Sequence, residues 1–226
     1  LVPRLDGLAL RHLKTVVCVG GEPPPPSPGL RPPGLQWLGE AALHGDAATL
    51  DDSAVVEHWD IQSIIYTSGT TGASKGVLSP YLQSYTTAMV VYGYLRDGES
   101  ILVNLPMFHV GGTSSTFAAL IRTGSIYLVD GFSTGKFWDQ VRAGQCVTTC
   151  GLIGVMSAFL AKAEPRPDDG DNPLRCLTMF PIEDFTVRFA QRFGFDYVTG
   201  FNMTEVSAPL ITDLNTRAFG SCGRPR

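Results

Sequence analysis

The sequence has 226 residues, 44% of them apolar, and a formal net charge of −4. These values predict a globular protein with a real core, and the lack of a basic block excludes the electrostatic footprint of a DNA- or RNA-binding protein. Five cysteines without a CxxC pair predict reduced thiols in a cytoplasmic protein. The longest apolar stretch, residues 151–161, is too short to span a bilayer, while peripheral membrane contact stays open.

The first 59 residues divide into two parts. A β-branched run at residues 15–19 predicts a buried strand, and we assign residues 1–21 to a strand-containing segment. The Pro-rich run EPPPPSPGLRPPG at 22–34 predicts an extended linker, with a ligand for an SH3-type domain as the alternative. Residues 35–52 have a weak helical pattern. Residues 22–59 are therefore interpreted as a linker and surface segment.

From residue 60 onward, short apolar β-branched runs alternate with helical patterns. This alternation predicts an α/β fold of βαβ units, with a mainly parallel sheet and helices on its faces. Ser79 and Pro80 are suited to the N-cap and first position of the first helix. The expected strands are 60–66, 101–105, 125–129, 147–149, 177–179 and 197–199. The expected helices are 80–95, 113–122, 134–143, 153–163 and 184–193.

The run YTSGTTGASKG at residues 66–76 follows the first of these strands. Glycines allow close backbone approach to a ligand, hydroxyls add donors, and one lysine supplies positive charge, which together favour a polyphosphate. An ordinary Gly/Ser/Thr loop is the alternative. A Walker-type loop requires Gly before the lysine and Ser or Thr after it, but Ser74 and Gly76 stand there. The residues expected to bind phosphate are Thr67, Ser68, Gly69, Thr70, Thr71, Gly72 and Lys75.

This loop resembles the phosphate-binding signature of the adenylate-forming (AMP-binding) superfamily, which includes acyl-CoA ligases. Three further segments resemble motifs of that family: PMFHVGG at 106–112, GFNMTE at 200–205 and GSCGRP at 220–225. The resemblance implies that residues 60–226 form the AMP-binding core, as part of the large N-terminal domain of such an enzyme. Carnitine- and betaine-type CoA ligases are the most similar subgroup.

The resemblance also implies roles for single residues. Glu205 is expected to bind Mg²⁺, because a hard cation that bridges phosphates needs a carboxylate. A hydroxyl on Thr204 would contact phosphate, and His109 would line the carboxylate pocket. The catalytic set is thus Lys75, His109, Thr204 and Glu205. The residues expected to bind the nucleotide are those of the phosphate loop together with Gly200, Phe201, Asn202, Met203 and Thr204.

Alternatives remain for several of these residues. Phe201, expected to stack on adenine, and Met203 have core packing as the alternative, and Glu205 has a solvated surface carboxylate. Asn202 either bonds adenine or caps a turn, and His109 has a purely structural role as its alternative.

The implied activity has two steps: ATP-dependent activation of a carboxylic acid, fatty or other acyl, as an acyl-adenylate, and transfer of the acyl group to CoA. Another adenylating enzyme (luciferase-like or a peptide-synthetase domain) and a non-catalytic nucleotide-binding remnant are the alternatives. Residues 179–183 (MFPIE) depart from the family's usual adenine loop. The chain also ends before the family's small C-terminal domain, so we expect an internal fragment that is inactive in isolation.

Overall fold

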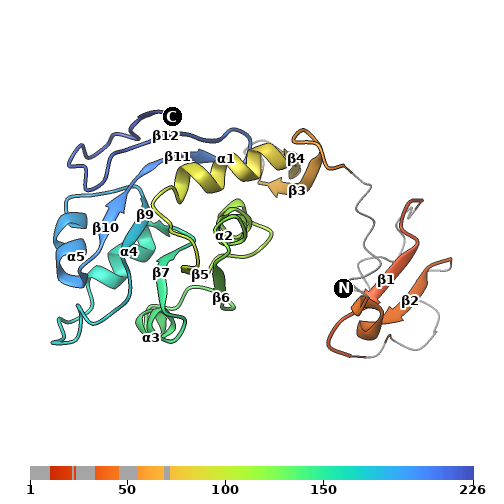
Figure 1. Cartoon of the computed structure of the whole chain (residues 1–226), viewed down its shortest axis with the longest axis horizontal. Coiled ribbons are helices and arrows are strands. Elements are labelled where there is room, and N and C mark those ends of the chain that lie inside the picture. Colours follow the sequence, from red (N-terminus) through yellow and green to blue (C-terminus); the bar gives the residue numbers. More distant parts are fainter. Residues whose placement is uncertain (1–10, 22, 24–33, 46–54, 69–71) are drawn as a thin grey trace. The chain divides into compact units, whose positions relative to one another are not determined.

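The computed structural model describes residues 11–21, 23, 34–45, 55–68 and 72–226. The chain forms two compact units, Leu1–Val55 and Val56–Arg226, each of which is described by itself (Figure 1). No helix in the described parts of either unit is long and apolar enough to cross a membrane.

The first unit contains a small parallel ribbon. Strand β1 (Thr15–Cys18) pairs in parallel with β2 (Gln36–Gly39), which is followed by a 3-10 turn, η2 (Glu40–Leu43). The strand predicted at residues 15–19 is confirmed, but the helix predicted over 35–52 is wrong for residues 36–39. Ladder hydrogen bonds to β1 hold these residues in an extended conformation, and Gly39 is extended as well, with φ −81° and ψ 173°. The Pro-rich run at 24–33 and residues 46–52 lie outside the described residues.

In the second unit, β5 (Ser100–Val103) is a central parallel strand between β6 (Ser125–Leu128) and β7 (Cys146–Thr149). Ile101, Leu102 and Val103 are fully buried. Their side chains alternate between the two faces of the strand, so a continuous apolar run predicts helices on both sides.

A second group of parallel strands continues this arrangement. Strand β9 (Cys176–Phe180) pairs with β8 (Leu152–Ile153) and with β10 (Asp196–Val198). The backbone N–H of Arg175 donates to the carbonyl of Val147 at 2.9 Å, which joins the start of β9 to β7. The predicted α/β fold with a mainly parallel sheet is confirmed.

Helices cover both faces of the parallel strands (Figure 1). Ile101 and Val103 belong to one buried cluster with residues of α1 and α2, whereas Leu102 belongs to another with residues of α3, α4 and α5. The five helices predicted from sequence are present; four are shorter than predicted, and α2 begins three residues earlier than predicted. They are α1 (Tyr81–Val91), α2 (Val110–Ile121), α3 (Phe137–Ala143), α4 (Gly154–Ala161) and α5 (Thr186–Phe193).

Antiparallel strands lie beside this core. Strand β3 (Ile61–Thr67), which confirms the strand predicted at 60–66, pairs with β4 (Lys75–Pro80). Strand β12 (Ser207–Ile211) pairs with β11 (Gly200–Met203) and β13 (Arg224–Pro225). Sequence reasoning missed β4, β11, β12 and β13.

The hairpin of β3 and β4 changes two predictions about α1. Ser79 lies within β4 and does not cap the helix; Pro80 is the N-cap residue, because the β3 ladder engages the preceding backbone. The helix also ends at Val91 and not at Leu95. The chain therefore turns back along β3 after the Gly/Ser/Thr loop before it enters the helix.

A buried hydroxyl cluster joins the segment that follows α1 to the sheet, and it gives a stability prediction. The Tyr94 hydroxyl shares hydrogen bonds with the hydroxyls of Thr148 (2.8 Å) and Thr178 (3.0 Å), two fully buried residues of β7 and β9. We expect Tyr94→Phe to lower the free energy of unfolding by about 1–2 kcal/mol, because two buried hydroxyls lose a partner. Urea unfolding checks this, with the exposed Tyr85→Phe as control; equal stability of the two variants would contradict the assignment.

Candidate active site

A cavity of about 550 Å³ opens near the carboxyl ends of the central strands, where ligands gather in α/β sheets. It brings together residues that are distant in sequence. They are Thr67 from the end of β3, Val91 and Tyr92 from the end of α1, Leu105, His109–Gly111 and Ser114 from the segment after β5, Cys150, Gly151 and Ile153 from the segment after β7, Phe180 and Pro181 after β9, and Gly200–Glu205.

Strand β11 and its turn form one wall of this cavity. The turn after Met203 is closed by a hydrogen bond from the Val206 N–H to the Met203 carbonyl (3.2 Å). Glycine is required at the start of β11, because a Cβ on Gly200 would lie 2.5 Å from the carbonyl oxygen of Leu210 in β12. The antiparallel pair therefore packs tightly and presents the following four side chains at the cavity.

Helix α1 holds this turn in place. Gln83 donates from Nε2 to the carbonyl of Thr204 at 2.6 Å, and the hydroxyls of Thr87 and Ser207 lie 2.5 Å apart. Ser207 adopts a left-handed backbone conformation, with φ +64°, which is uncommon for a residue with a side chain. The turn that carries Thr204 and Glu205 is thus fixed at the cavity wall, with an exposed Glu205 carboxylate.

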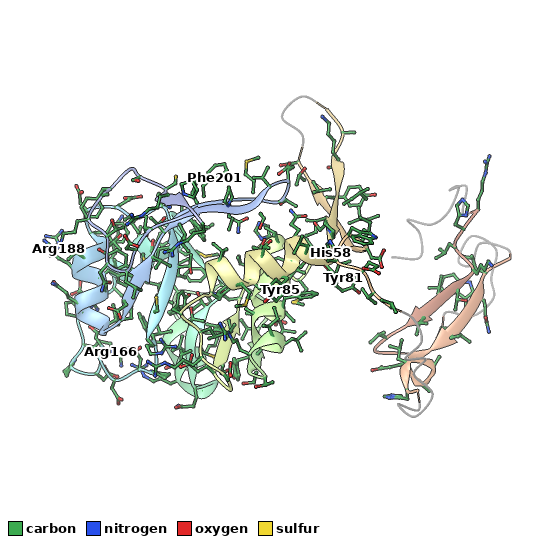
Figure 2. All side chains as sticks on the ribbon, turned by 45° about the horizontal axis from the view of Figure 1, so that its top comes forward. His58, Tyr81, Tyr85, Arg166, Arg188 and Phe201 are labelled. Carbon is green, nitrogen blue, oxygen red and sulfur yellow. The ribbon has the colours of Figure 1, made fainter. Side chains whose placement is uncertain are left out.

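The side chains of β11 fit a planar, polar ligand. Phe201 (labelled in Figure 2) and Met203 are 38% and 43% exposed and line the cavity, so core packing does not account for them. The buried Oδ1 of Asn202 has no hydrogen-bond partner among the residues that the structure describes. A buried acceptor without a partner at a cavity wall favours a ligand that donates a hydrogen bond, such as the amino group of adenine.

His109 occupies the N-cap position of α2. Its Nδ1 accepts a hydrogen bond from the Gly111 N–H at 2.9 Å, so the neutral ring carries its proton on Nε2. Partial desolvation lowers the pKa of His109, which favours the neutral ring at pH 7. A Cβ on Gly112 would collide with the carbonyl oxygen of Pro106, so glycine there allows the helix to start close to the preceding backbone.

The lowered pKa of His109 gives a pH prediction. Since the unfolded ring binds a proton at a higher pH than the folded ring, stability from this group is present above about pH 6.5 and is lost as the pH falls through the folded pKa. Asparagine at this position can still cap the helix but does not titrate. We therefore expect His109→Asn to flatten the dependence of unfolding free energy on pH below 6.5. Chemical denaturation at a series of pH values checks this, and parallel curves for the two proteins would contradict it.

The phosphate loop is only partly brought to the cavity. Thr67 lines it, but Lys75, Ser68 and Gly72 are exposed and lie outside the lining. Lys75 is the direct cross-strand partner of Thr67 in the β3–β4 ladder, so its backbone lies one strand away from the wall. Gly69, Thr70 and Thr71 are outside the described residues.

Sequence reasoning missed the wall residues Tyr92, Cys150 and Phe180. Their position at the carboxyl ends of parallel strands could have identified two of them, since ligands bind there: Cys150 follows β7 directly, and Phe180 is the last residue of β9. The Cys150 thiol donates to Oδ1 of Asn104 at 2.8 Å, and burial raises its pKa to about 11. The thiol is therefore protonated at neutral pH and is a wall group without nucleophilic character.

The donor set permits one type of metal binding. Across the described ranges, no group of three His, Cys, Asp or Glu side chains gathers to hold an ion. Magnesium, however, is commonly held by one or two carboxylates together with the phosphates of a substrate. Glu205, an exposed carboxylate at the cavity wall beside the Thr204 hydroxyl, fits that mode.

Comparison with solved structures defines the class of fold. The inhibitor-bound N-terminal domain of FACL13 from Mycobacterium tuberculosis superposes with a TM-score of 0.67 and 23% identity, over 84% of this chain and 50% of that one. The O-succinylbenzoate coenzyme A synthetase of Bacillus subtilis in complex with ATP and magnesium ion gives 0.68 and 23%, over 84% and 41%. The chain has the fold of the N-terminal domains of adenylate-forming enzymes.

Sequence comparison then gives the family. Residues 30–226 match the AMP-binding enzyme family, and the chain belongs to it. A crotonobetaine/carnitine–CoA ligase of Salmonella typhimurium is 32% identical over 189 residues, which are 79% of this chain and 36% of that protein. A 2-succinylbenzoate–CoA ligase of Bacillus velezensis is 26% identical over 187 residues, 80% and 38% respectively. The chain thus spans under two fifths of the length of these relatives, and the predicted resemblance to CoA ligases is confirmed.

Proposed function

We propose that this chain carries the ATP- and acid-binding part of an acid–thiol ligase that forms an acyl-CoA by way of an acyl-adenylate. One observation carries the proposal: a single cavity joins Thr67, His109 and the Gly200–Glu205 segment, three motifs widely separated in the sequence. Family membership and the relatives named as CoA ligases support it.

In the first step, a carboxylate oxygen of the acid attacks the α-phosphorus of ATP and pyrophosphate leaves. The neutral His109 offers its Nε2 proton to the acid, while the hydroxyls of Thr67 and Thr204 bind phosphate oxygens. The ring of Phe201 and the free Oδ1 of Asn202 take the adenine. These groups act by positioning and charge neutralisation, and no covalent bond to the protein is needed.

Magnesium and CoA complete the proposed set of ligands. Glu205 would hold Mg²⁺ together with the phosphates, and a bound magnesium ion would neutralise phosphate charge. A thiol then attacks the acyl carbonyl, the acyl–phosphate bond breaks, and AMP leaves. A small-molecule carboxylic acid, ATP and CoA are the proposed partners. The cytoplasmic location stays a prediction.

ATP–pyrophosphate exchange across a panel of carboxylic acids tests this function. The assay is run on this chain and on any longer product of the same reading frame, with Mg²⁺ present. Exchange that depends on one class of acid is the expected result for a protein that includes the family's remaining segments, and the 226-residue chain alone is expected to bind Mg·ATP without turnover. Binding of ATP without exchange in every form would favour a non-catalytic nucleotide-binding protein.

A further inference from the structure

The part of the cavity that does not face β11 is mainly apolar, and its polar side chains (Thr67, His109, Ser114 and Cys150) are uncharged at pH 7. Its wall is built by Tyr92, Leu105, Val110, Ile153 and Phe180, which come from α1, the two ends of the β5–α2 connection, β8 and β9. These residues belong to different elements of the second unit, so their convergence is a property of the fold and not of one motif. The nucleotide-binding groups proposed above lie elsewhere, on β3, on β11 and in the turn after β11.

Charge is nearly absent from this cavity. The lining contains no Lys, Arg or Asp, and its ionisable side chains are His109, Glu205, Tyr92 and Cys150. Burial raises the pKa values of Tyr92 and Cys150, and desolvation lowers that of His109, so these three are neutral at pH 7. The second unit's residues outside the described ranges, 69–71, are Gly, Thr and Thr, which carry no charge. Glu205 is the one anionic group in the wall.

From this we infer that the site selects carboxylic acids with an uncharged, apolar tail and rejects acids with a second charge at the far end of the tail. The inference rests on the proposed function. A charged end group placed among these side chains would lose its hydration without gaining an ion-pair partner, a large cost, whereas an apolar end group gains from burial. This separates the chain from relatives named for 2-succinylbenzoate and for carnitine, acids that carry a second charged group.

An aromatic cage for a cationic tail is the strongest competing arrangement. Such a cage presents ring faces within about 6 Å of the cation. Tyr92 is only 2% exposed and packs edge-on against Tyr94, and the carboxylate of Glu205 is assigned to magnesium. Phe201 is assigned to adenine, so Phe180 is the one aromatic ring of the lining that is left for the tail, and one ring does not form a cage.

Three acids of matched shape test the inference. Each is a butanoate with a tetrahedral end group: tert-butyl, trimethylammonium or sulfonate. Their affinities for the 226-residue chain are measured by titration calorimetry in the presence of saturating Mg·AMP. We expect the tert-butyl acid to bind at least about ten-fold more tightly than either charged acid. Equal affinities, a preference for a charged tail, or no binding of any acid to the AMP-loaded chain would overturn the inference.

A wall variant makes the test specific to this site. Ile153 lines the cavity and is 47% exposed, so Ile153→Lys introduces a cation without burying it in the core. We expect this variant to bind the sulfonate acid about ten-fold more tightly than the unaltered chain does and to lose the preference for tert-butyl. Val155→Lys, at a neighbouring residue that is 65% exposed and outside the lining, is the matched control. Unchanged affinities in Ile153→Lys would contradict the assignment of the wall.

The same titrations test the proposed function and the inference about the acid tail separately. Failure of Mg·AMP to bind the unaltered chain would overturn the proposed function and, with it, the inference. Binding of Mg·AMP together with indifference to the charge of the tail would overturn the inference alone.

Discussion

We expect Glu205→Gln to lower the affinity of the chain for Mg·ATP by about 10- to 100-fold and to leave the affinity for metal-free ATP nearly unchanged. The substitution keeps the size of the side chain and removes its charge. The loss is expected because the cation is held by one protein carboxylate and by phosphate, so one charge-assisted contact is a large part of its binding. Fluorescent-nucleotide titrations in Mg²⁺ and in EDTA measure both affinities.

The control for this result is Glu164→Gln, since Glu164 is an exposed carboxylate outside the cavity lining. It should bind Mg·ATP as the unaltered chain does. An equal loss in Mg²⁺ and in EDTA would show that Glu205 acts on the nucleotide or on the fold and not through magnesium. No loss in either condition would assign Glu205 to the solvated surface.

We expect Lys75→Ala to lower the affinity for ATP by about ten-fold at low ionic strength, and we expect the difference to shrink as salt is added. Lys75 is exposed and stands opposite Thr67 in the hairpin, so its charge reaches the phosphates through a solvent-exposed path that ions screen. The same titrations at two salt concentrations check this. Lys162→Ala is the matched control, since Lys162 is an exposed lysine at the end of α4.

The Lys75→Ala variant also distinguishes a lysine that binds phosphate from one that stays in solvent. A salt-sensitive loss supports a phosphate-facing lysine. If ATP affinity is unaltered at low salt, the exposed position seen for Lys75 is its working position, and phosphate binding is left to Thr67 and Thr204.

The parallel core could be predicted from sequence because its signals are local. Buried runs such as Ile101–Val103 and helical patterns such as that of α5 identify an α/β fold before any contact is known. Strand β4 was missed because Lys75–Pro80 begins with Lys-Gly and ends in proline, which favours a loop or a helix start. Pairing with β3, a tertiary interaction, decides its conformation.

The candidate site shows the same difference between residues with a local sequence signal and residues placed by tertiary structure. Motifs with a chemical signature, Gly200–Glu205 and His109, could be predicted, and the structure places them in one cavity. The apolar wall could not be predicted, because Tyr92 and Phe180 are ordinary core-type residues whose function depends on where the strands and α1 end. Sequence patterns also placed Lys75 with the phosphate groups, but its side-chain position depends on the hairpin.

Hydrogen exchange of the chain with and without Mg·ATP tests most directly whether this cavity is the nucleotide site. We expect slower exchange in peptides that contain Gly111 and residues 200–206, which bound nucleotide would cover, and no change in α5 (Thr186–Phe193), which lies outside the cavity lining. Protection confined to other parts of the chain, or saturable binding without protection of residues 200–206, would contradict it.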